Sequence, residues 1–192
     1  MPVTSDIAAP VVRGIAPKTL GPDMMSIAQL HRALGMDESF NAEFAILSPH
    51  LRKITKNWVD EIPMMIVQDE SAQDNMTIRD LNGINAHVRL YMEAMYSGRF
   101  YEEFEYPLDG IALILRAHGI NPGWATMAFS SSFDSAQQKL FFETRQSNSR
   151  VFPAALRCLM KILILTVHLL GRRDHELNDI TPQKGKRASQ AG

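Results

Sequence analysis

Apolar residues recur every three or four positions along most of the chain, the spacing typical of helices that bury one face. The clearest case predicts a helix over 77–97, and Gly98 follows it as a natural stop. The apolar positions of this helix are Ile78, Leu81, Ile84, Val88, Tyr91 and Met95. No stretch alternates apolar and polar residues between hairpin turns, as paired strands would. The pattern therefore predicts an all-α domain.

The same periodicity predicts five further helical segments in the middle of the chain. They cover about 37–47, 48–62, 107–118, 122–145 and 149–171. The segment from 48 opens at Ser48-Pro49, a cap residue followed by proline at the first helical position, and Pro63 interrupts it.

Proline and glycine mark the ends of this helical region. Residues 1–36 contain several of both without a sustained period, so we expect an irregular N-terminal extension with a short helix near 24–34. Residues 37–171 form the predicted domain, and 172–192 form a polar tail. The basic residues of that tail, Lys184, Lys186 and Arg187, are expected to be a solvated end.

The last predicted helix is apolar on more than one face. Its apolar residues are Leu156, Leu159, Met160, Ile162, Leu163, Leu165, Val167, Leu169 and Leu170. Lys161 and His168 interrupt the run, which is shorter than the roughly 18 residues of a membrane span. We therefore expect no membrane span, and a second subunit as the partner for the second face.

Composition narrows the functional classes. The formal net charge of −1 argues against a nucleic-acid binder that works by phosphate neutralisation. The single cysteine, Cys158, excludes an intrachain disulfide, and residues 1–9 lack the pattern of a secretory signal, so we expect a cytoplasmic protein.

No motif for enzyme chemistry is present: there is no phosphate-binding glycine loop, no His-Glu-x-x-His and no Gly-x-Ser-x-Gly. Glu102, Glu103 and Glu105 are acidic residues at a predicted helix start, where the helix dipole favours them. We therefore predict that the protein is not an enzyme and holds no metal site.

Two histidines are candidate haem or metal ligands, because neutral imidazole is a common one. His87 shares the apolar stripe of the 77–97 helix, and the alternative is a hydrogen-bonded core histidine. His118 ends the following helix, where the alternative is a cation at the helix C-terminus. His168 is expected in the core or an interface, whereas His31, His50 and His175 are expected to be peripheral.

Three segments resemble the sensor globins, the haem domains of globin-coupled sensors and the related protoglobins. They are YMEAMYSGRFYEEF at 91–104, GIALILRAHGINPGW at 110–124 and FPAALRCLMKILIL at 152–165. The resemblance extends over about 40–171 and implies a globin fold, with the last two helices of each subunit forming a four-helix bundle in a homodimer. It also implies a sensory role, with the signal passed to an output partner.

The chain departs from this family at positions that would touch haem or bound gas. Leu115 stands where the family has its iron-binding histidine, Val59 where a distal tyrosine often lies, and Ala125 where an aromatic residue follows the tryptophan. Because leucine cannot donate to iron, a haem would need His87 or His118 as its ligand. Tyr91 is an oxygen-type ligand candidate as well as an ordinary core aromatic.

The sequence leaves three functions open. The first is a haem-free sensor-type globin whose pocket is packed shut or takes an apolar ligand, lined by Val59, Ile84, His87, Tyr91 and Leu115. The second is a haem-binding oxygen or redox sensor that uses His87 or His118. The third is a structural dimerisation module. In the first, we expect the signal to pass to another protein or through the tails, since the roughly 20 residues after Gly171 are too few for a core of their own.

Overall fold

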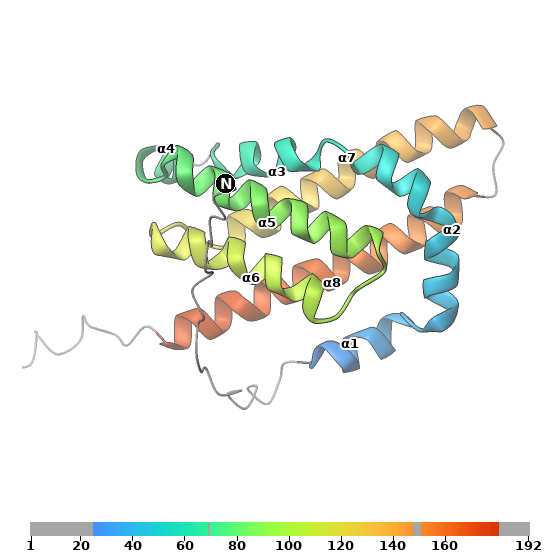
Figure 1. Cartoon of the computed structure of the whole chain (residues 1–192), viewed down its shortest axis with the longest axis horizontal. Coiled ribbons are helices and arrows are strands. Elements are labelled where there is room, and N and C mark those ends of the chain that lie inside the picture. Colours follow the sequence, from blue (N-terminus) through green and yellow to red (C-terminus); the bar gives the residue numbers. More distant parts are fainter. Residues whose placement is uncertain (1–24, 69, 148–150, 181–192) are drawn as a thin grey trace, which may run out of the picture.

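The computed structural model describes residues 25–68, 70–147 and 151–180, which form eight helices and no strand (Figure 1). This confirms the predicted all-α class. The helices are α1 (Ile27–Leu34), α2 (Glu38–Thr55), α3 (Trp58–Ile66), α4 (Glu70–Asn75), α5 (Ile78–Tyr96), α6 (Glu102–Ala117), α7 (Gly123–Ser147) and α8 (Val151–Ile180). The irregular extension expected before residue 25 and the basic end of the tail lie outside the described residues.

Four of the eight helices form two neighbouring pairs. Helices α5 and α6 run antiparallel beside each other, and the two longest helices, α7 and α8, form the second pair (Figure 1). Helix α3 packs on both α5 and α7, α6 also packs on α8, and α2 lies across one end against α7 and α8. The core between these elements is almost entirely aliphatic and aromatic.

The predicted boundaries of α5 are confirmed because its ends contain strong local signals. Thr77 and Asp80 form a capping box that satisfies amides of the first turn. At the other end Gly98 has φ +67°, and the Arg99 amide donates to the Ala94 carbonyl at 2.9 Å. Gly119, with φ +71°, ends α6 in the same way. Both positions need the left-handed conformation that glycine adopts without strain.

The helix boundary predicted at Ser48-Pro49 is wrong. Helix α2 continues through Pro49 and ends at Thr55, and α3 begins at Trp58 after the cap residue Asn57. A proline inside a helix costs about 3 kcal/mol, but Pro49 is exposed and the buried stripe of α2 runs on through Leu51 and Ile54. Burial on both sides of the proline offsets its cost, at about 1.5–3 kcal/mol for each large apolar side chain. In the next helix, Pro63 is likewise accommodated within α3.

The start of α6 and the end of α8 also differ from the prediction. Helix α6 begins five residues earlier than expected, at Glu102, so the acidic residues 102, 103 and 105 do form its first turn. Helix α8 continues past Gly171 to Ile180, so the first part of the predicted polar tail is helical. Ion pairs tie this extension to α6: Arg172 pairs with Glu105, and Arg173 Nε lies 3.7 Å from Asp109 Oδ1.

One of the two apolar faces predicted for the last helix is buried within the chain. One face of α8 is fully buried, including Cys158, Leu159 and Ile162. Burial raises the pKa of the Cys158 thiol to about 11, so this residue remains neutral and packs as a small apolar side chain. The segment Val151–Arg173 is long and apolar enough to cross a membrane, but 44% of its most apolar window is buried within this fold. A core helix passes the same test of length and composition.

Candidate functional site

The interface between α5 and α6 is the candidate site, because it contains most of the predicted pocket residues. Ile84 and Tyr91 on α5 and Leu115 on α6 are completely buried and belong to one hydrophobic core, and Val59 of α3 packs against that core. The structure thus brings four of the five predicted pocket residues into the same core. His87, the fifth, is half-buried, and its Nδ1 atom is buried.

Side chains fill the space around Tyr91. Its ring lies 4.6 Å from the ring of Phe104 and 4.9 Å from that of Phe129, measured between centroids. The hydroxyl group, also buried, lies 2.9 Å from the Thr166 hydroxyl of α8. Burial raises the pKa of Tyr91, and the Thr166 hydroxyl partly offsets that rise. Tyr91 is therefore a neutral, hydrogen-bonded core aromatic in this arrangement and not an ionised oxygen ligand.

Two glycines allow α5 and α6 to approach closely. A methyl group added at Gly110 would lie 2.1 Å from the His87 ring, so this ring lies directly over the backbone of α6. At Gly83, an added methyl group would lie 3.1 Å from Ile114 Cδ1. Neither glycine was predicted to be a contact position, because each is an isolated glycine within an otherwise regular helical pattern.

His87 is held at this interface by packing. Its ring lies 5.9 Å from that of Tyr106, and its Nδ1 atom is buried without a hydrogen-bond partner. Burial lowers the pKa of His87, which favours the neutral imidazole. The hydrogen bond expected of a core histidine is absent at Nδ1, and the ring lies against Gly110.

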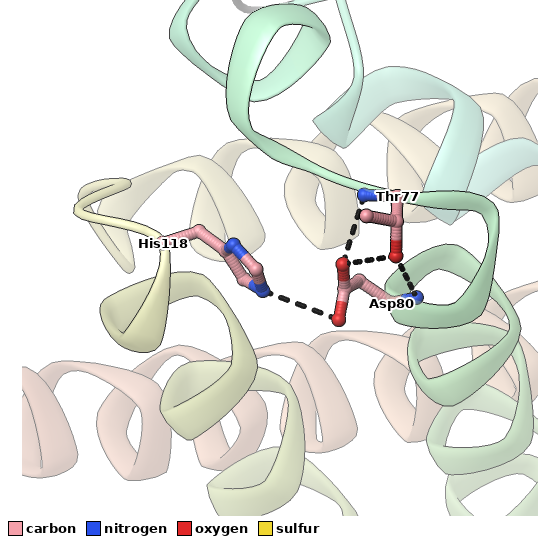
Figure 2. A network of polar contacts seen from close by, with 3 residues as sticks. All are labelled: Thr77, Asp80 and His118. Atoms are coloured by element: carbon pink, nitrogen blue, oxygen red, sulfur yellow. Dashed lines mark hydrogen bonds and ion pairs between the residues drawn. The ribbon is translucent and has the colours of Figure 1, made fainter.

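His118 lies at the C-terminal end of α6, as the helix-end alternative predicts. Its Nε2 atom lies 3.2 Å from Asp80 Oδ1, so the end of α6 is joined to the start of α5 (Figure 2). The pKa of Asp80 is lowered, chiefly by hydrogen bonds from the Thr77 hydroxyl and amide, with a smaller contribution from His118. His118 therefore contributes to an inter-helix contact near the surface.

These positions do not fit a bound haem. Leu115 has no atom that can bind iron, His118 is engaged by Asp80, and the His87 ring is pressed against Gly110. A haem between α5 and α6 would have to separate two helices that are in direct contact. Within the described residues, no three histidine, cysteine or acidic side chains gather closely enough to hold a metal ion.

The other histidines show one clear error of the sequence interpretation. His31, predicted to be peripheral, is only 4% exposed, and its ring lies 4.3 Å from that of Tyr101. The sequence contains a signal for this burial: His31 follows Ile27 by four residues and precedes Leu34 by three, so the three residues share one face of a helix. Burial lowers the pKa of His31, and the nearby Phe100 carbonyl partly opposes this. His50 and His175 are exposed, as expected, and His168 Nε2 lies 3.1 Å from the Met25 carbonyl oxygen.

A second feature is an apolar stripe on the outer side of α7 and α8. On α8 it consists of Leu156, Met160, Leu163, Ile164 and Val167, which recur every three or four residues. Met160 and Ile164 are 39% and 44% exposed, and Phe141 and Phe142 of α7 are 47% and 64% exposed. Where the stripe meets α7, Phe141, Phe142, Phe152 and Leu156 line a hollow of about 410 Å³. We call this surface the outer stripe.

Comparison with known proteins gives no relative: no protein-family model, curated protein or solved structure matches this chain.

Proposed function

We propose that this chain is a haem-free globin domain of the sensor type, which acts in signalling as a homodimer through α7 and α8. The observation that carries the proposal is the outer stripe, an apolar surface on the two longest helices. A large exposed apolar surface of this kind is typical of an interface. Paired stripes from two subunits would build a four-helix bundle, the assembly implied by the sensor-globin resemblance.

The packing of α5 on α6 supports the haem-free part of the proposal. The resemblance to sensor globins implies a haem between these two helices. In this chain His87 contacts Gly110 there, and Leu115 is completely buried. The signal would then act on the dimer or on a protein partner, rather than on an iron centre. A structural dimerisation module would share the same outer stripe and would differ only in transmitting no signal.

The dimer is tested by placing a charge in the outer stripe. We expect the wild-type chain to sediment as a dimer, and Met160→Glu/Ile164→Glu to sediment as a folded monomer, because buried unpaired carboxylates are strongly unfavourable. The matched control is Ile46→Glu/Met64→Glu, which changes two apolar residues that are 76% and 64% exposed on α2 and α3. A monomeric wild type, or a dimer that survives the stripe variant, would refute the proposal.

The haem-free part is tested by absorption spectra taken before and after addition of hemin. We expect no saturable one-to-one Soret band in the wild type. His87→Ala and His118→Ala are measured alongside it. A band that is present in the wild type and lost in one of these variants would identify the haem ligand and replace the proposal with a haem-binding oxygen or redox sensor.

A further inference from the structure

A groove of about 870 Å³ lies where α1, the end of α5 and the start of α6 meet. This volume is within the usual range for ligand-binding clefts, which is about 300–1,000 Å³. None of its lining residues belongs to α7 or α8, so the groove is separate from the outer stripe. We call it the α5–α6 groove.

Large, partly apolar side chains remain exposed in this groove. Leu90, Tyr101 and Tyr106 line the groove, and they are 42%, 53% and 65% exposed. Tyrosine is enriched in binding sites because its ring offers contact area and its hydroxyl a hydrogen bond. Together the three residues present an aromatic and aliphatic surface to any molecule that enters.

The charged residues that line the groove are mostly acidic. Glu93, Glu102 and Glu103 line it, and Arg99 is the single basic residue among them. Within the described part of the chain, no ion pair engages any of the three carboxylates. By contrast, four other glutamates are paired: Glu43, Glu61, Glu105 and Glu143.

The helix dipole explains two of these carboxylates but not the third. Glu102 and Glu103 lie in the first turn of α6, where negative charge is favourable. Glu93 lies in the last turn of α5, which contains no basic residue, and negative charge there is unfavourable. Glu93 is exposed to solvent, and the helix dipole does not stabilise its charge, whereas a cationic ligand in the groove would.

We propose that the α5–α6 groove binds a basic peptide segment of a partner protein, with arginine and large apolar side chains. Guanidinium groups would pair with Glu93, Glu102 and Glu103 and stack on the rings of Tyr101 and Tyr106. Apolar side chains of the peptide would cover Leu90. This inference goes beyond the proposed function, since it requires neither a globin relationship nor a dimer.

The test is a titration followed by fluorescence anisotropy. The probe is a fluorescein-labelled peptide of leucines and arginines, Gly-Leu-Arg-Arg-Leu-Arg-Arg-Leu-Gly, and the protein is the full chain. We expect saturable one-to-one binding, and at least a tenfold loss of affinity in Glu93→Gln/Glu102→Gln/Glu103→Gln. Tyr106→Ser, which keeps all charges, is expected to weaken binding several-fold because stacking is lost.

The matched control is Glu38→Gln/Asp60→Asn/Glu70→Gln, which removes the same charge from exposed residues outside the groove. We expect its affinity to stay within twofold of the wild type. An equal loss in the control would mean general attraction to an acidic protein and would overturn the proposal, as would absence of saturable binding. Displacement of the peptide by spermine at a similar concentration would also overturn it, in favour of a small cation.

Sedimentation of the same variants separates this inference from the proposed dimer. The groove variant is expected to keep the wild-type mass, while Met160→Glu/Ile164→Glu is expected to keep its affinity for the peptide. A change of mass in the groove variant would make the groove a self-association surface and overturn the peptide proposal.

Discussion

The α5–α6 interface and the outer stripe of α7 and α8 are both rich in apolar residues, but they differ in what those residues contact. At the α5–α6 interface, Ile84, Tyr91 and Leu115 are completely buried, and the two helices approach over Gly110. On the outer stripe, Met160 and Ile164 remain more than a third exposed. The first region is filled by the chain itself, whereas the second has apolar surface left to bury. This difference favours a function that depends on surfaces rather than on an interior ligand.

The largest expected effect is at the centre of the filled region. Leu115→Ala should lower the free energy of unfolding by about 2–5 kcal/mol, because it removes buried methyl groups and leaves a cavity. Leu113→Ala, on the same helix but at a residue that is 45% exposed, should cost less than about 1 kcal/mol. Urea denaturation measures both. A loss below about 1 kcal/mol at Leu115 would indicate an open pocket and weaken the contrast between the regions.

The next effect concerns the close approach of α5 and α6. Gly110→Ala should cost about 1–3 kcal/mol, because the new methyl group would overlap the His87 ring. Gly171→Ala has open space around it and should instead stabilise α8 by about 0.5–1 kcal/mol.

A double-mutant cycle shows whether the cost arises at the His87 ring. His87→Ala/Gly110→Ala should be more stable than the two single changes predict when added, because the shortened side chain leaves room for the methyl group. Additive effects in thermal denaturation would show that His87 does not contact Gly110.

A smaller effect is expected from pH. Burial lowers the pKa of both His31 and His87 from 6.5, so the folded chain binds fewer protons than the unfolded chain just below that pH. The stability that comes from keeping these imidazoles neutral is therefore complete above about pH 6.5. It is lost as the pH falls toward the lowered pKa values of the two histidines in the folded chain. Urea denaturation between pH 7 and 5 should show stability falling with acidity.

The pH effect is tested by replacing a half-buried histidine, His87, and, as the control, an exposed one, His50. His87→Gln should flatten the pH dependence, by at most about 1.4 kcal/mol per pH unit, the value for one proton. His50→Gln, at an exposed residue, should leave the slope unchanged. An equal slope in wild type and His87→Gln would show that folding does not change the pKa of His87.

The smallest effect on folding is expected on the outer stripe. Phe142→Ser, at a side chain that is 64% exposed, should change the stability of a monomer by less than about 0.5 kcal/mol. It should nevertheless weaken the dimer measurably if Phe142 is covered by the second subunit. Denaturation at low protein concentration and sedimentation at high concentration separate the two effects. A large loss of monomer stability would mean that the stripe already belongs to the core.

Local signals were enough to predict much of the fold. The three-to-four spacing identified the helical class, α5 and the apolar character of α8, and Gly98 and Gly119 marked true helix ends. These features depend on residues near one another in sequence, because backbone sterics and capping operate within a few positions. Prolines were less informative: α2 continues through Pro49 because the buried side chains around it outweigh one lost hydrogen bond.

The sequence by itself determined which residues are apolar, that the chain is helical, where α5 begins and ends, and that Leu115 cannot bind iron. Only the tertiary structure decided what lies opposite each side chain. It placed the His87 ring on Gly110, joined His118 to Asp80 and buried His31 beside Tyr101. It also gathered Glu93 with residues of the next helix in one groove. The physical reason is that periodicity defines which face of a helix is buried, whereas the partner of that face comes from distant parts of the chain.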